Sequence, residues 1–266
     1  MAGSHQDKVA VISGAARGIG QAFAHRLAHD GAHIVIADVL PATDTAKFVQ
    51  EAGRHVLAAN CDVSSESSVN ALAAEVTARF GRCDILINCA GIYPRQPFAE
   101  MTFADWRRMQ AINLDSVFLM CAAFVPGMRG RKWGRIVNLA SSTLGTVVSG
   151  FVHYTASKGG VVGFTRALAT ELGDDGITVN AISPGLTRSP GTLARAPRPV
   201  SFPKTLSIGF AIAGESEHDC GCSQLPSFSS ACCATPSSRD DGLKSKSWCC
   251  GINSTSCSSA RHVGSI

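Results

Sequence analysis

The segment that most constrains the fold lies near the amino terminus, where an apolar run meets a cluster of glycines. Residues 8–13 (KVAVIS) predict a short buried strand that continues directly into the turn 14–20 (GAARGIG), and residues 21–28 have the apolar periodicity of a helix. Glycine lets a backbone approach a pyrophosphate closely, and a helix amino terminus offers free N–H groups. Strand, glycine turn and helix therefore predict a dinucleotide site, although an ordinary strand-to-helix turn is the alternative. Its candidate contacts are Gly14, Arg17, Gly18, Ile19 and Gly20.

A second predicted strand, residues 33–37, ends in an acidic residue. Asp38 stands 18 residues after Gly20, close to the ~20 expected of a carboxylate that bonds the ribose hydroxyls. A carboxylate there would repel the extra phosphate of NADP, so NAD is the predicted cofactor. Arg17 could instead pair with that phosphate, which leaves NADP as the less favoured alternative.

Strand patterns continue along the chain with helical stretches between them. They occur at 8–13, 33–37, 56–60, 84–88, 135–139 and 177–182. Alternation of this kind predicts a parallel sheet with helices on both faces, and the unbroken apolar runs suit strands that are buried on both sides. We expect a doubly wound, Rossmann-type α/β fold in one domain, residues 1–197, with its site along the carboxyl ends of the strands.

Tyr154 and Lys158 suggest chemistry, because a spacing of four residues places two side chains on the same face of a helix. A free tyrosine has a pKa near ~10 and is a poor base at neutral pH. A neighbouring cation favours the phenolate and lowers that pKa, so the phenol can exchange a proton with an alcohol or ketone. The alternative is a solvated helix face.

Taken in order, these features resemble the short-chain dehydrogenase/reductase family over residues 8–190. Supporting motifs are 61–63 (CDV), 88–91 (NCAG, with cysteine where the family has a second asparagine), 112–114 (INL), Ser141 three residues after Asn138, and 180–185 (NAISPG). Ser141 is favoured over Ser142 by its place 13 residues before Tyr154. The resemblance implies four catalytic residues, Asn113, Ser141, Tyr154 and Lys158. It also implies cofactor contacts from Asp62, Val63, Asn88, Ala90, Gly91, Tyr154, Lys158, Pro184, Gly185 and Thr187.

Several segments are similar to the bacterial 1-phenylethanol dehydrogenase branch, namely 80–86 (FGRCDIL), 90–94 (AGIYP), 124–128 (FVPGM) and 133–136 (WGRI). This implies reversible hydride transfer between NAD and a small aromatic or otherwise apolar secondary alcohol. Candidate pocket walls are Tyr93, Leu144, Val147, Phe151 and Val152. The runner-up is a 3-oxoacyl-[acyl-carrier-protein] reductase, which would use a basic patch such as Arg129, Arg131 and Lys132. A binding protein built on a catalytically impaired scaffold is the third interpretation.

Composition limits the partners and the compartment. The formal net charge is +4 without a basic block, which argues against a nucleic-acid partner. By sequence, no apolar run approaches the ~20 residues of a membrane span, and the start lacks a signal-peptide pattern, so we expect a cytoplasmic protein with a small-molecule substrate and no membrane partner. The family is commonly tetrameric through segments near 100–125 and 154–172. The resemblance therefore implies a homo-tetramer or dimer, if the tail permits one.

The tail, residues 198–266, departs from the family. Its last 66 residues hold 16 serines and 7 of the 11 cysteines, and we expect it to be poorly ordered. The cysteine spacings do not suit zinc, and without a secretory signal a disulfide module is disfavoured. The leading hypothesis is a reading-frame change near residue 200, because 236–239 (PSSR) can be encoded by bases that spell Phe-Ile-Thr-Gly in another frame. Without the family's last strand and lid, a sheet edge and the pocket would be open.

Overall fold

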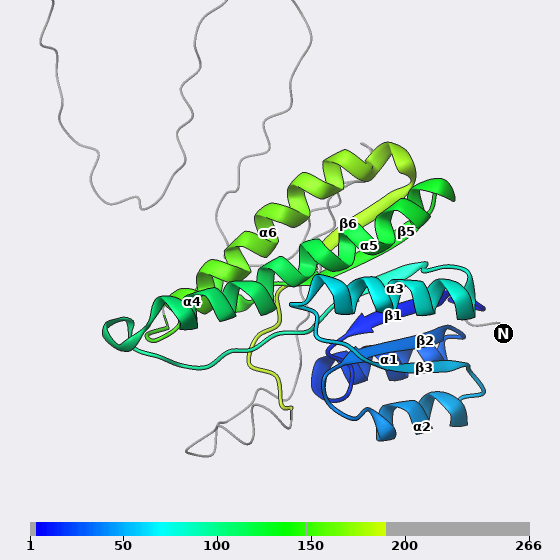
Figure 1. Cartoon of the computed structure of the whole chain (residues 1–266), viewed down its shortest axis with the longest axis horizontal. Coiled ribbons are helices and arrows are strands. Elements are labelled where there is room, and N and C mark those ends of the chain that lie inside the picture. The colour runs from blue at the N-terminus through cyan, green and yellow to red at the C-terminus, as the bar shows by residue number, and fades with distance from the viewer. Residues whose placement is uncertain (1–3, 147, 190–266) are drawn as a thin grey trace, which may run out of the picture. The chain divides into compact units, whose positions relative to one another are not determined.

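The computed structural model describes residues 4–146 and 148–189, and these form a doubly wound α/β fold. Six parallel strands make one sheet in the order β3-β2-β1-β4-β5-β6 (Figure 1). They are β1 (Val9–Ser13), β2 (His33–Asp38), β3 (Val56–Asn60), β4 (Ile85–Asn88), β5 (Gly134–Leu139) and β6 (Ile177–Ile182). All six predicted strands are confirmed to within one residue at each end. The predicted boundary at residue 197 and the tail 198–266 lie outside the described residues.

Within the described residues, six helices connect the strands, together with four short helical turns. The helices are α1 (Gly18–His29), α2 (Thr43–Glu51), α3 (Glu66–Phe80), α4 (Phe103–Gln110), α5 (Ser116–Gly130) and α6 (Val152–Leu172). The turns are η1 (Phe98–Glu100), η3 (Ser142–Leu144) and η4 (Gly173–Asp175), which are 3₁₀-helical, and η2 (Ala111–Asp115), which is π-helical.

The sheet is buried on both faces, which explains why its strands are continuous apolar runs. Ile34 and Ile36 of β2 pack with residues of α1 and α2. Val35, between them, points to the opposite face and packs with residues of α3, α5 and α6. Figure 1 shows α1 and α2 on one side of β1–β3 and α3 on the other. A parallel sheet covered in this way directs the carboxyl ends of its strands to one common edge.

One helical stretch corrects the expectation that no segment reaches the length of a membrane span. Within the described residues, Phe103–Gly130 is 28 residues long with a mean hydropathy of 1.6 over its most apolar window, so it could cross a membrane by length and composition. Its side chains Met120, Phe124 and Met128 are buried in the core beside the sheet. Packing within this fold therefore accounts for the apolar character of the stretch.

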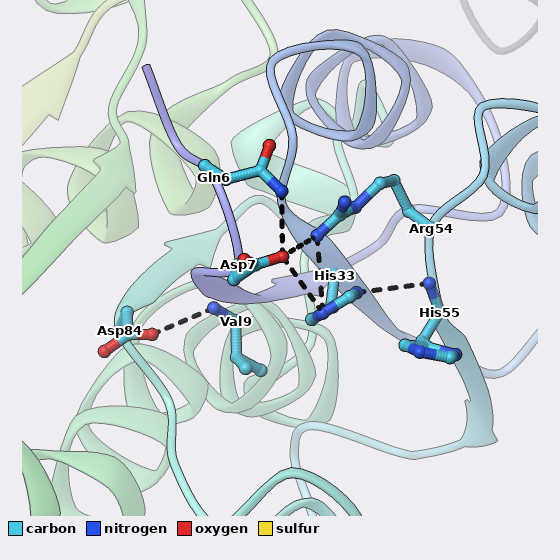
Figure 2. A network of polar contacts seen from close by, with 7 residues as sticks. All are labelled: Gln6, Asp7, Val9, His33, Arg54, His55 and Asp84. Carbon is cyan, nitrogen blue, oxygen red and sulfur yellow. Dashed lines mark hydrogen bonds and ion pairs between the residues drawn. The ribbon is translucent and has the colours of Figure 1, made fainter. Parts of the chain in front are cut away.

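The amino-terminal ends of the strands are held by a network of polar contacts (Figure 2). Arg54 donates a hydrogen bond to Asp7 at 2.5 Å, and the Asp7 carboxylate lies 3.8 Å from Nε2 of His33. The backbone N–H of His55 donates to Nδ1 of His33 at 3.2 Å, which links the starts of β2 and β3. Fully buried Asp84 accepts from the first N–H of β1 at 2.9 Å. These contacts stabilise the amino-terminal ends of the strands, whereas the candidate site lies at the carboxyl ends.

Candidate active site

The glycine turn between β1 and α1 is shaped by close approach to neighbouring backbone. Gly14 has φ +69°, and a Cβ atom added there would lie 2.7 Å from the Cα of Ala90. A Cβ at Gly20 would collide with the carbonyl oxygen of Gly14. Gly18, also at positive φ, begins α1, and no described side chain caps that helix. Its first N–H groups are therefore available to an anion, as a bound pyrophosphate requires.

Asp38 lies beside this turn at the end of β2. Its carboxylate accepts hydrogen bonds from the backbone N–H groups of Ala16, at 2.9 Å, and Leu40, at 3.0 Å. The negative group is therefore fixed against the glycine turn, where a ribose attached to the pyrophosphate would extend. Arg17, the residue before α1, is exposed, and Ile19 is half-buried in the first turn of that helix.

Asp62 and Val63 follow β3 at the same sheet edge. The N–H of Cys61 donates to the carbonyl oxygen of Asp38 at 3.0 Å, which brings this segment beside the end of β2. The exposed Asp62 carboxylate accepts from the backbone and the hydroxyl of Ser64, at 2.9 and 2.6 Å. Val63 is buried in the core. The two residues thus lie near Asp38, in the half of the edge opposite Ser141.

The turn after β4 is fastened to β1 by a serine that the sequence analysis missed. The Ser13 hydroxyl accepts from the N–H groups of Cys89 and Ala90, both at 3.1 Å. Ser13 is also only 2% exposed. Its position as the last strand residue before Gly14 was the available signal, because a strand-end hydroxyl is suited to bond a neighbouring turn.

Asn88 is turned into the core. Its Nδ2 donates to Oδ1 of Asn138 on β5 at 2.8 Å, and Asn138 donates in turn to Thr165 of α6 at 2.9 Å. The amide donor of Asn88 therefore couples β4 to β5, and a cofactor would meet the backbone of this turn at Ala90 and Gly91. The sequence analysis used Asn138 only to locate Ser141 and did not single out Thr165, because the partners of interior amides and hydroxyls have no distinctive spacing.

Ser141 stands just after β5, where the segment following β6 meets it. The N–H of Ser142 donates to the carbonyl oxygen of Pro184 at 3.1 Å, and the Thr187 hydroxyl donates to the carbonyl oxygen of Gly185 at 3.2 Å. Oγ of the buried Ser141 accepts from the backbone N–H and the hydroxyl of Thr143, at 3.2 and 3.0 Å, and the same side chain lowers the pKa of the Tyr154 phenol by hydrogen bonding. The structure thus places Ser141, rather than Ser142, against the phenol.

Tyr154 and Lys158 project from the first two turns of α6, and their electrostatics differ from the expectation. Nζ of Lys158 donates to the carbonyl oxygen of Leu139 at 2.6 Å and lies 6.0 Å from the centroid of the Tyr154 ring. Burial raises the pKa of Tyr154, and the hydrogen bond with Ser141 opposes this rise. The predicted lowering by Lys158 is therefore wrong here, because desolvation of the phenol dominates and the ammonium is directed at Leu139. Burial also lowers the pKa of Lys158 to about 8.

Asn113 lies behind this group in the π-helical turn η2. It is fully buried, its Oδ1 accepts from the N–H of Ile92 at 2.8 Å, and its Nδ2 donates to the carbonyl oxygen of Ile92 at 2.8 Å. A Cβ at Gly91 would lie 3.2 Å from Oδ1 of Asn113 and 3.7 Å from Nζ of Lys158. Asn113 therefore fixes the loop after β4 against the lysine, and π-turns of this kind often occur at functional sites.

Two aromatic rings border the phenol. Tyr93 and Phe151 make edge-on contacts with Tyr154, with ring centroids 6.5 and 5.6 Å away. Leu144 and Val152 are 42% and 46% exposed. Val147, the remaining predicted wall, lies outside the described residues.

Comparison with known proteins shows the family to which these residues belong. Residues 8–198 match the family model described as short chain dehydrogenase. Nodulation protein G of Azospirillum brasilense is 43% identical over 182 residues, covering 67% of this chain and 74% of that protein. The D-threitol dehydrogenase of Mycolicibacterium smegmatis is 43% identical over 180 residues, covering 66% and 69%. A short chain dehydrogenase from Mycobacterium paratuberculosis, solved bound to NAD, is 31% identical with a TM-score of 0.68 and coverage of 71% and 75%.

Proposed function

The chain belongs to the short-chain dehydrogenase/reductase family, and from this membership we propose that it interconverts a secondary alcohol and its ketone with NAD as cofactor. The observation that carries the proposal is the placement of Tyr154 one helical turn before the buried Lys158, whose Nζ lies 6.0 Å from the centroid of the phenol ring, with buried Ser141 acting on the same phenol. A phenol can exchange a proton with an alcohol, and a neighbouring hydroxyl and cation can stabilise the oxygen that loses the proton.

In the oxidation direction, ionised Tyr154 takes the hydroxyl proton of the alcohol. The Ser141 hydroxyl donates a hydrogen bond to the same substrate oxygen and stabilises the charge that develops on it. Lys158 holds positive charge near the phenolate, and Asn113 keeps the adjoining loop in place so that a proton can pass toward solvent. When bound beside this group, a nicotinamide cofactor would supply the hydride chemistry at the alcohol carbon.

The residues at the sheet edge fit such a cofactor. The uncapped start of α1 would hold the pyrophosphate, and Asp38 would bond the adenosine ribose, with Asp62 and Val63 on the adenine side. The backbone at Ala90, Gly91 and Pro184 would border the nicotinamide half. We favour NAD over NADP because the fixed Asp38 carboxylate would repel a 2′-phosphate.

A small aromatic secondary alcohol is the proposed substrate class. Tyr93 and Phe151 already surround Tyr154 with ring edges, which suits an apolar aromatic body next to the reacting carbon. The rival thioester reductase is less well supported, because its candidate basic patch is engaged within the chain. Arg129 and Lys132 both pair with Asp175, at 2.7 and 2.6 Å.

Two further features of the proposal are catalytic competence and assembly into an oligomer. A catalytically impaired binding protein is disfavoured by the assembled Ser141, Tyr154 and Lys158. We propose a cytoplasmic homo-oligomer, whose interface would include the segment near 100–125, where the rings of Phe103 and Phe118 are 76% and 58% exposed.

The test is turnover of 1-phenylethanol with NAD⁺ and of acetophenone with NADH, compared with NADP(H) and with a 3-oxoacyl thioester. We expect oxidation of the aromatic alcohol, with kcat/KM at least about tenfold higher for NAD⁺ than for NADP⁺, which corresponds to about 1.4 kcal/mol. Faster reduction of the thioester with NADPH would overturn both the substrate class and the cofactor preference.

A further inference from the structure

A hollow lies between the loop after β4, helix α4 and the start of α6, outside the group formed by Ser141, Tyr154 and Lys158. Its volume is about 330 Å³, and it is lined by Ile92, Pro94, Arg95, Gln96, Asp105, Arg108, Met109 and His153. We call it the α4 hollow, and Figure 1 shows α4 beside the start of α6. One water accounts for roughly 30 Å³ of liquid volume, so this space suits a small organic molecule better than a single water.

The strongest indication of a ligand is the side chain of His153. It is 1% exposed, it lines the α4 hollow, and neither of its ring nitrogens has a hydrogen-bond partner among the described residues. Buried polar groups are normally hydrogen-bonded, because an unmade bond leaves their desolvation uncompensated. Burial lowers the pKa of His153, so the ring is neutral at pH 7 and presents one donor and one acceptor.

The charged groups of the lining favour an anion. Arg95 and Arg108 both line the hollow, and no acidic partner is recorded for either among the described residues. Arg95 donates through Nε to the carbonyl oxygen of Ser149 at 3.1 Å, which anchors its stem and leaves its terminal nitrogens for another acceptor. These two guanidinium groups therefore give the lining of the α4 hollow positive charge that can bind an anion.

The acidic residue of the lining opposes an anion but does not cancel this preference, because one carboxylate faces the two guanidinium groups of Arg95 and Arg108. Asp105 accepts from the backbone N–H and the hydroxyl of Thr102, at 3.0 and 2.6 Å, and from Nε2 of Gln96 at 3.0 Å. These bonds lower the pKa of Asp105 to about 2. The remaining lining includes Ile92, Pro94 and Met109, which offer apolar contact.

We propose that the α4 hollow binds a small organic carboxylate, with its acid group at Arg95 and Arg108 and an uncharged polar group at His153. Guanidinium groups bind carboxylates through directed, charge-assisted hydrogen bonds. The occupant also contacts Ile92, whose backbone is held by Asn113, and His153, which precedes Tyr154. A ligand here would therefore contact the loop after β4 and the residue before Tyr154 without contacting the reacting atoms.

The probe is 4-hydroxybenzoate, which has an acid, an apolar ring and a hydroxyl but no secondary alcohol to oxidise. Calorimetric titration of 4-hydroxybenzoate into the full chain, with NADH at saturating concentration, should show binding at a single site. The neutral 4-hydroxybenzamide should bind at least tenfold more weakly. Arg108→Gln should weaken 4-hydroxybenzoate at least tenfold. The matched control is Arg107→Gln, an exposed neighbour on α4 that does not line the hollow and should bind as the wild type does.

Two further measurements separate this site from the catalytic one and from an interface. Tyr154→Phe should leave the affinity unchanged, and the ring ¹⁵N resonances of His153 should move on titration. The proposal is overturned by equal binding of the acid and the amide, by equal loss in Arg107→Gln and Arg108→Gln, or by equally strong binding of inorganic phosphate. Loss of binding in Tyr154→Phe would assign the probe to the catalytic site, and a fall in sedimentation mass of Arg108→Gln would assign the hollow to an interface.

Discussion

At the scale of single residues, the proposed chemistry depends on a tension between burial and hydrogen bonding at Tyr154. Burial raises the pKa of the phenol, whereas the bond with Ser141 lowers it. Lys158 is desolvated as well, since it is 5% exposed and bonds the carbonyl oxygen of Leu139. The protein therefore holds two ionisable groups in forms that are less charged than they would be in water.

Replacing Ser141 should move the pH profile of alcohol oxidation. Ionised Tyr154 is the proposed base, so the rate rises with pH as the phenol loses its proton. Ser141→Ala removes the bond that lowers the pKa of Tyr154, and the rising limb should shift to higher pH in addition to a fall in kcat of roughly 10²-fold. Ser142→Ala is the control, and the rising limb of its pH profile should lie at the same pH as in the wild type. A Ser141→Ala profile that lies at the same pH as the wild type would show that this bond does not tune the phenol.

At the scale of elements, the strands and the glycine turn could be predicted because their signals are local. A continuous apolar run such as 33–37 indicates burial on both faces, and Gly20 is required by a steric contact with Gly14, six residues earlier. The side-chain partners of Asn88 and Asn113 could not be predicted. Each pairs with a segment brought near only by the completed fold, and the sequence contains no spacing that encodes such a contact.

The electrostatic prediction for Lys158 and Tyr154 failed for a related reason. Their spacing along α6 correctly places them on one helix, but the carbonyl oxygen that receives the lysine belongs to Leu139 at the end of β5. Local spacing predicted the shared helix but the wrong direction for the pKa of Tyr154, because burial is a property of the packed molecule.

The π-turn of η2 provides a test at this scale. Asn113→Ala should leave the N–H and carbonyl groups of Ile92 without their partners, and we expect the free energy of unfolding to fall by about 2–4 kcal/mol with a loss of kcat. Gln110→Ala, one turn earlier, removes a single bond to the carbonyl oxygen of His153 and should cost about 1 kcal/mol. Urea unfolding measures both. Equal losses in the two variants would contradict the special role of the Asn113 contacts.

At the scale of the whole molecule, the boundary of the family match agrees with the change in composition. The match ends at residue 198, where the serine- and cysteine-rich tail begins. The reading-frame change near residue 200 stays a hypothesis, and a resequenced gene tests it directly. The described part of the chain nevertheless contains the complete proposed catalytic group.

Stability should fall as the pH drops below about 6.5. Burial lowers the pKa of His33 from its ordinary 6.5, and Nδ1 of that ring already accepts the N–H of His55 (Figure 2). The unfolded chain therefore binds more protons than the folded chain in this range, so the stabilising contribution is complete above pH 6.5 and declines below it. The urea midpoint should be lower at pH 5.5 than at pH 7.5.

Variants at two histidines separate this effect from general acid sensitivity. His33→Gln keeps an acceptor for the His55 N–H but cannot titrate, so it should have a smaller decrease in midpoint between the two pH values. His29→Gln is the matched control, because the His29 side chain is 81% exposed. If both variants reproduce the wild-type decrease, His33 does not contribute to it.

The central claim, that Tyr154 exchanges the proton with the substrate, is tested most directly by Tyr154→Phe. Turnover of 1-phenylethanol and NADH affinity should be measured on the same preparation, with the NADH-induced rise in Tm as the check that the fold and the dinucleotide site are intact. The account predicts a kcat reduced by at least about 10²-fold with nearly unchanged NADH affinity, because the ring remains and only the acid/base group is lost. Retained turnover in a variant that binds NADH normally would contradict it.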